Sequence, residues 1–198
     1  LALGEPVWQK FAKEINSDSR SNTYGWLSQF PAFREWIGAR LHKKRSEQAF
    51  TVANRKFEST IDIDNDDIED NNFGHYADIA EGAGQSVVDL HNDIMFGALK
   101  DGFASICYDG QYFFDADHPI APNEDGTGTV TTYSNLQAGT GEPWVLLCTK
   151  RSAKPIYLQN RTGKATFTLL NEGSAGADND YISFGGKWRG NAAYGFWQ

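Results

Sequence analysis

The clearest hydrophobic pattern of the chain runs over residues 70–102. Its apolar positions recur at steps of three and four, which places them on one face of a helix: Phe73, Tyr76, Ala80, Ala83, Val87, Leu90, Ile94 and Ala98. Acidic residues crowd the start, where they favour the positive end of the helix dipole, and Gly102 provides a stop. The pattern predicts an amphipathic helix roughly 45 Å long, with a bend or close contact at Gly82 to Gly84. The alternative is an ordinary core helix with a frayed first turn.

The hydrophobic period changes to two over residues 50–64, which is typical of β-strands. One strand is predicted from Phe57 onward and a shorter one at Phe50 and Val52, with a turn between them. A two-stranded hairpin is marginal on its own, so we expect it to pack on its own core or on another molecule. Its candidate contact residues are Phe50, Val52, Asn54, Arg55, Lys56, Phe57, Ile61 and Ile63.

Aromatic residues are concentrated near the N-terminus. Residues 7–15 predict a short amphipathic helix after Pro6, and residues 24–38 are dense in aromatic side chains. Such density indicates either a local core cluster or a segment that docks on a neighbouring surface. The candidate docking residues are Trp8, Phe11, Tyr24, Trp26, Phe30 and Trp36.

The last third of the chain is predicted to be rich in β-strands. Apolar and alternating runs predict strands at residues 144–148, 155–159, 165–170, 181–184 and 193–197. Together with the long helix, these strands indicate an α+β fold of one domain or two small ones.

The net charge of the chain argues against one class of function. The formal net charge is -8, which argues against a dedicated nucleic-acid binder. A local basic run is nevertheless present, formed by Arg40, Lys43, Lys44 and Arg45. It is predicted to be a solvated face or to contact the acidic surface of a neighbour or DNA. Cys107 and Cys148 are predicted to be buried free thiols.

Candidate catalytic and metal-binding chemistry is weak. Residues 62–66 resemble the start of a calcium loop, but the Gly and Glu positions that an EF-hand needs hold Asp67 and Phe73. Asp115, Asp117 and His118 lack a second His or a Cys pair at ligand spacing, so a structural role is favoured. We therefore predict no enzyme activity, no metal and no cofactor. The alternatives are an aromatic-rich carbohydrate-binding module, which the long helix argues against, and a small metal-dependent hydrolase, which lacks ligands.

Several motifs together resemble a known family. They lie at residues 24–27 (YGWL), 31 (P), 34–38 (REWIG), 54–58 (NRKFE), 68–70 (IED), 108–111 (YDGQ), 113–114 (FF), 117–119 (DHP), 134–139 (SNLQAG) and 194–198 (YGFWQ). In this order they resemble the Mu-like prophage major head subunits, which are capsid proteins of tailed phages.

The resemblance implies the Hong Kong 97-type phage capsid fold, with an antiparallel peripheral sheet. It implies an N-terminal arm and docking segment at residues 1–44, an extended β-hairpin loop at 45–67, a spine helix and following loop at 68–143, and a β-rich peripheral segment at 144–198. Family members continue into a further α/β region, assigned mainly to the axial domain, so the axial domain is expected to be missing or partial here.

The resemblance also implies a function. A major capsid protein self-assembles, through hexamers and pentamers, into the icosahedral shell that encloses phage DNA. The implied partners are further copies of the chain, packaged double-stranded DNA on the inner face, and scaffold, protease, portal or decoration proteins, with no membrane. The implied location is the virion, after assembly in the bacterial host cytoplasm. Residues 1–198 alone are expected to fold but not to close into shells.

Overall fold

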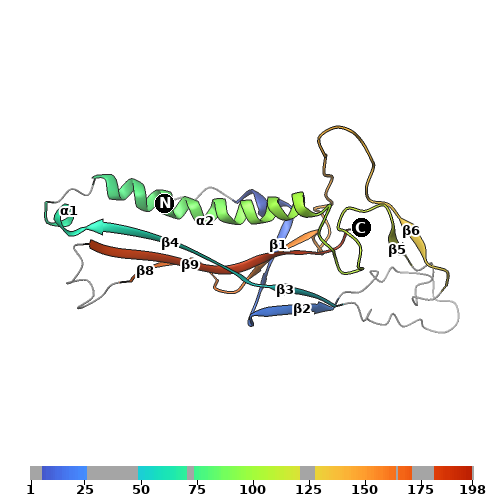
Figure 1. Cartoon of the computed structure of the whole chain (residues 1–198), viewed down its shortest axis with the longest axis horizontal. Coiled ribbons are helices and arrows are strands. Elements are labelled where there is room, and N and C mark those ends of the chain that lie inside the picture. Colours follow the sequence, from blue (N-terminus) through green and yellow to red (C-terminus); the bar gives the residue numbers. More distant parts are fainter. Residues whose placement is uncertain are drawn as a thin grey trace.

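The computed structural model describes residues 6–25, 49–70, 74–120, 128–163, 165–170 and 181–197. The molecule is elongated, and its long helix α2 lies along a long sheet (Figure 1). In chain order the elements are η1 (Val7–Lys10), β1 (Ala12–Asn16), β2 (Ser21–Gly25), β3 (Ala49–Ala53), β4 (Arg55–Asp64), α1 (Asn65–Glu69), α2 (Gly74–Asp101), β5 (His118–Ile120), β6 (Thr131–Tyr133), β7 (Ile156–Asn160), β8 (Thr166–Leu169) and β9 (Tyr181–Tyr194).

Strand β9 organises the main sheet, whose order is β1-β7-β9-β4, with β8 also paired to β9. The β1–β7 pair is parallel, and the others are antiparallel. Residues 181–184 and 193–194, predicted as parts of two strands, belong to this one strand. At Gly190, β9 pairs with both β4 and β7. A Cβ there would overlap the Gln159 carbonyl and the Trp188 ring, so glycine is required for this close approach.

The predicted hairpin between residues 50–52 and 57–64 is wrong. Strand β3 pairs with β2, and β4 pairs with β9 over its whole length, from Arg55 opposite Gly190 to Asp64 opposite Tyr181. The period-two pattern identified both strands correctly, but it could not identify their partners. Alternation reports only which face of a strand is covered, whereas pairing depends on residues more than a hundred positions away.

The predicted long helix is present as α2, one uninterrupted helix (Figure 1). A Cβ at Gly82 would meet nothing within 4 Å, so Gly82 itself makes no close contact. The acidic run before the helix forms the separate short helix α1, and the Asp64 side chain caps it by accepting a hydrogen bond from the Asp66 N–H at 3.0 Å. Residues 64–66 therefore act as a helix start rather than a calcium loop.

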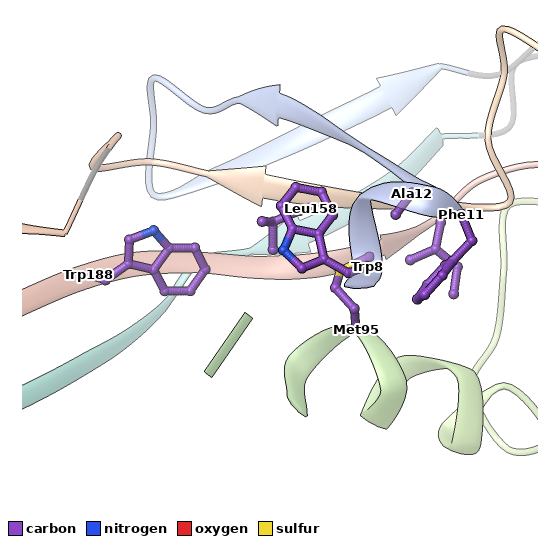
Figure 2. Packing of buried hydrophobic residues seen from close by; sticks show 7 residues of the cluster. Trp8, Phe11, Ala12, Met95, Leu158 and Trp188 are labelled. Atoms are coloured by element: carbon purple, nitrogen blue, oxygen red, sulfur yellow. The ribbon is translucent and has the colours of Figure 1, made fainter. Parts of the chain in front are cut away.

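The main core cluster lies between α2, the sheet and the N-terminal segment. Figure 2 shows Met95 of α2 pointing toward Trp8 and Leu158. The buried members are Trp8, Phe11, Ala12, Met95, Ile156, Leu158 and Trp188. Met95 is fully buried, while Leu90, Ile94 and Ala98 of the predicted stripe are only partly buried around the cluster. The stripe prediction thus located the buried side of the helix but missed its most buried residue.

Three further predictions differ from the structure. The helix predicted over residues 7–15 is only the 3-10 helix η1, because residues 12–16 pair with β7 as strand β1. Residues 144–148 form no strand and follow an irregular, exposed path. Cys107 is a buried free thiol as predicted, but Cys148 is exposed. Among the described helices, none combines the length and apolar character needed to cross a lipid bilayer.

Candidate functional site

The predicted aromatic docking residues lie in different environments. Trp8 and Phe11 are buried in the chain's own core, so these two side chains stabilise the subunit instead of being presented to a neighbour. Tyr24 is half-buried, and its hydroxyl donates to Gln159 Oε1 at 2.6 Å. Trp26, Phe30 and Trp36 lie outside the described residues, as do Arg40, Lys43, Lys44 and Arg45 of the basic run.

The predicted hairpin residues are partly committed to the subunit itself. Val52 is buried in a small cluster with Tyr157 and Ala193. The Asn54 side chain donates to Ser17 Oγ at 2.7 Å. Phe57 packs against Trp188, with ring centroids 5.6 Å apart. The remaining members are exposed or half-buried: Phe50, Arg55, Lys56, Ile61 and Ile63.

Gln159 of β7 connects the β2–β3 pair to the main sheet, and sequence reasoning missed it. Its side chain is fully buried. Its amide nitrogen donates to the Val52 carbonyl at 3.2 Å and to Asn54 Oδ1 at 2.7 Å, while its oxygen accepts from Tyr24. A glutamine in an apolar run gives no signal of this role before the strand order is known. The network holds the base of the β2–β3 pair in a fixed place.

A buried polar cluster joins Cys107, Asp109 and His118. The Asp109 carboxylate accepts from the Cys107 thiol at 2.8 Å and from the His118 imidazole at 2.7 Å. His118 is fully buried and stacks on Trp197, with ring centroids 3.9 Å apart. Among the described residues, these three form the group whose potential metal ligands lie within 4.8 Å of one another.

The chemistry of this cluster is that of a buried hydrogen-bond network, in which His118 Nε2 has no hydrogen-bond partner among the described residues. Burial and the hydrogen bond to Asp109 raise the pKa of the Cys107 thiol to about 12, so the thiol is protonated at neutral pH and is not a thiolate nucleophile. Burial raises the pKa of the Asp109 carboxyl, but hydrogen bonds from His118 and Cys107 outweigh it and the net pKa is lowered. The thiol contacts Asp109 rather than the imidazole, which is not a nucleophile–base arrangement.

Asp115 and Asp117, the other two candidate hydrolase residues, do not join that cluster. Asp115 accepts from the Tyr112 N–H at 3.2 Å and its own N–H donates to Asn135 Oδ1 at 2.8 Å. Asp117 is exposed. Asp115 therefore has a turn-forming role, as the sequence favoured.

One end of the molecule is strongly acidic. This acidic end comprises the described residues 59–70, 74–81, 165–170 and 181–186, where β4, β8, β9 and α1 meet the start of α2 (Figure 1). It contains no Lys or Arg, and its acidic members are Asp62, Asp64, Asp66, Asp67, Glu69, Asp70, Asp78 and Glu81. Large apolar side chains are exposed beside them, namely Ile79, Leu169, Leu170, Tyr181 and Phe184. Acidic and apolar groups together give this end the character of a contact surface.

Comparison with known proteins identifies the family. The family model of the Mu-like prophage major head subunit gpT matches residues 1–198. The major capsid protein of Escherichia phage Mu is 41% identical over 196 residues, which are 96% of this chain and 64% of that protein. The Mu-like prophage FluMu major head subunit of Haemophilus influenzae is 37% identical and is matched by 100% of this chain over 66% of its own length. The chain thus spans about two thirds of these relatives' length.

Solved structures agree with the family model. A chain of the procapsid of bacteriophage JBD30 is 42% identical, with a TM-score of 0.84 over 99% of this chain and 67% of that one. A chain of the JBD30 capsid is 28% identical, with a TM-score of 0.74 over 99% of this chain and 64% of that one. The fold is therefore the mixed α/β fold of phage capsid proteins, and these relatives are structural proteins rather than enzymes. Because the family model matches from the first residue to the last, the chain belongs to the Mu-like prophage major head subunit family.

Proposed function

We propose that this protein is the major capsid subunit of a Mu-like phage head, which assembles through hexamers and pentamers into the icosahedral shell that encloses the phage DNA. The observation that carries the proposal is the match of 99% of the chain to a procapsid subunit with a TM-score of 0.84. A shell subunit needs several surfaces that only further copies can cover. The acidic end, with its exposed apolar residues, is one such surface.

The parts of the fold are assigned as follows. Helix α2 is the spine helix, and β4, β7, β8 and β9 form the peripheral sheet of a Hong Kong 97-type fold. The β2–β3 pair is the base of the extended loop, because β4 is committed to β9 along its length. The loop assigned from sequence to residues 45–67 is thereby moved to residues 21–53.

The basic run contacts the acidic end of a neighbouring subunit. Arg40, Lys43, Lys44 and Arg45 lie between β2 and β3 in the sequence, so they belong to the reassigned loop. The acidic end has no cation of its own within its described residues, and opposite charges steer such contacts and favour the correct partner. Trp26, Phe30 and Trp36 lie in the same loop and supply apolar contacts there.

Further partners follow from the same assignment. The shell encloses double-stranded DNA on its inner face, and scaffold, protease, portal and decoration proteins act with it during assembly in the host cytoplasm. One solved JBD30 capsid is decorated with minor capsid protein trimers, which supports a decoration partner here.

The test measures the assembly state of the expressed protein. Analytical ultracentrifugation and negative-stain images across concentration and salt should show oligomers that grow with concentration. Charge reversal with Lys43→Glu and Lys44→Glu should strongly reduce the assembled fraction. The matched control reverses Lys10 and Lys13, which are exposed on η1 and β1, and should leave it unchanged.

Two results would contradict these proposals. A protein that stays monomeric at every concentration would overturn the capsid assignment. Normal assembly of the Lys43 and Lys44 variant, with a change only in DNA retention, would show that the basic run contacts DNA instead of a neighbour.

A further inference from the structure

The cluster of Cys107, Asp109 and His118 has the composition of a zinc site. Thiolate, imidazole and carboxylate groups are the side-chain ligands that zinc takes in proteins. One potential ligand atom from each residue lies within 4.8 Å of the other two, and the described residues contain no other group of three for which this holds. No motif in the sequence indicated the site, because its members meet only through the fold.

The backbone holds the ligand residues in place. The Cys107 N–H donates to the Gln111 carbonyl at 2.8 Å and the Gly110 N–H donates to the Cys107 carbonyl at 3.2 Å, which closes a tight turn after α2. Gly110 has a φ of 86°, a conformation that favours glycine. His118 begins β5 beside this turn, and its ring stacks on Trp197. The fold therefore sets the positions of the ligands before a metal binds.

The distances within the cluster are slightly shorter than those of a metal site. The Asp109 carboxylate lies 2.8 Å from Cys107 Sγ and 2.7 Å from His118 Nδ1. In a tetrahedral zinc site these pairs of atoms lie roughly 3.5 and 3.3 Å apart, since Zn–S bonds are about 2.3 Å and Zn–N and Zn–O bonds about 2.0 Å long. The two contacts must therefore open by less than about 1 Å, which small side-chain rotations supply.

A zinc ion balances the charges of this buried cluster. In the metal-free protein Asp109 is ionised and the Cys107 thiol is protonated. A coordinating thiol is deprotonated, so its proton passes to solvent, and the single proton of the neutral imidazole moves from Nδ1 to Nε2. His118 Nε2 has no hydrogen-bond partner among the described residues, so this shift gives up no hydrogen bond there. The two charges of the ion then equal those of thiolate and carboxylate, as burial requires.

We propose that Cys107, Asp109 and His118 bind one zinc ion. The fourth ligand is a water or the Tyr112 carbonyl, whose oxygen lies 4.0 Å from Cys107 Sγ. Thiolate and imidazole select zinc over Mg²⁺ and Ca²⁺, which take oxygen ligands. The ion ties the turn of residues 107–112 to β5. This inference goes beyond the proposed function and does not depend on it.

Cobalt(II) is the probe for the site, because it takes the ligands and geometry of zinc and, unlike zinc, absorbs light. Protein freed of metal by chelation under reducing conditions should bind one equivalent of Co²⁺ with a thiolate-to-cobalt charge-transfer band, and Zn²⁺ should displace it. Cys107→Ser should abolish the band. The matched control, Cys148→Ser, removes the exposed cysteine and should keep the band.

Zinc should also stabilise the folded protein. At a free Zn²⁺ concentration about 100 times the Kd, the unfolding midpoint of the wild type should rise by roughly 5–10 °C, and that of Cys107→Ser should not. Mg²⁺ at the same concentration is the control ion and should leave both midpoints unchanged. Equal stabilisation by Mg²⁺ would show that divalent cations bind the acidic end instead, and would overturn the inference.

The cobalt spectrum of the wild type tests the inference even if Cys107→Ser does not fold. A wild-type protein without the charge-transfer band would overturn it, and so would a band that Cys148→Ser abolishes. The monomeric fraction serves for these measurements. A chain that never assembles would therefore overturn the proposed function alone, whereas a missing band would overturn the zinc site alone.

Discussion

The main core cluster and the acidic end are built from the same two elements, α2 and β9, yet they bury very different amounts of apolar surface. At the core cluster, Met95 of α2 is 0% exposed and Trp188 of β9 is 2% exposed. At the acidic end, Ile79 of α2 is 44% exposed and Tyr181 of β9 is 40% exposed. The same helix and the same strand run through both regions, so the difference in burial comes from the other elements that pack against them.

The additional element at the core cluster is the N-terminal segment. Trp8 and Phe11 come from η1 and the residue after it, and β1 adds a parallel strand beside β7. The backbone N–H of Trp8 donates a hydrogen bond to Asn92 Oδ1 of α2 at 3.3 Å. At the acidic end, no described element packs over α2 and the sheet in the way that η1 and β1 do at the core cluster. One helix on one sheet leaves the outer parts of both uncovered there, which fits a region whose cover comes from a neighbouring copy.

The largest effect is expected from the core cluster. Trp8→Ala should lower the free energy of unfolding by about 3–5 kcal/mol, because it removes a buried ring and leaves a cavity between α2 and β7. Denaturant titration of the monomer measures it. Val7→Ala, on the exposed neighbour in η1, is the control and should change the value by less than about 0.5 kcal/mol. Equal effects would show that η1 does not contribute to the core.

Loss of the Gln159 network should have the second largest effect. Gln159→Leu leaves the Tyr24 hydroxyl and the Asn54 side chain without this buried partner, at a cost of about 1–3 kcal/mol. Hydrogen exchange should also become faster at β2 and β3. The control, Gln9→Leu at the surface, should change neither the free energy of unfolding nor the exchange rates at β2 and β3. Unchanged exchange at β2 and β3 would mean that Gln159 does not hold this pair.

Acid should weaken the region around His118 through Asp109. Because the pKa of Asp109 is lowered in the folded state, its stabilising contribution is complete above the unfolded pKa of about 3.9 and is lost as pH falls through the folded value. The wild-type unfolding midpoint should therefore fall more steeply than that of Asp109→Asn as the pH is lowered below about 4. Asp78→Asn, on exposed helix surface, should keep the wild-type slope, and parallel profiles for wild type and Asp109→Asn would contradict this prediction.

The smallest effect on folding is expected at the acidic end. Ile79→Ala and Tyr181→Ala should each change the free energy of unfolding by about 1 kcal/mol or less, because Ile79 remains 44% exposed and Tyr181 40% exposed. The same variants should reduce the assembled fraction measured by ultracentrifugation. A large loss of stability without any change in assembly would show that these residues of the acidic end stabilise the fold and do not contact a neighbouring copy.

Much of the local structure could be predicted from the sequence, since it depends on neighbours along the chain. The three-and-four spacing identified α2, and the alternation after Phe57 identified β4. The acidic run was recognised as a helix start, which the Asp64 cap confirms. The failure at residues 144–148 has a physical cause. An apolar run is compatible with a buried strand, a helix or an exposed contact, and periodicity cannot distinguish them.

The sequence by itself determined the family and the two long elements, because these follow from local spacing and short motifs. Only the tertiary structure decided that β4 pairs with β9 and not with β3, that Gln159 holds the β2–β3 pair, and that Asp109 joins Cys107 to His118. It also decided that Trp8 is core while Trp144 is exposed. The reason is that pairing and burial are set by residues far apart in the chain, whose meeting no local pattern encodes.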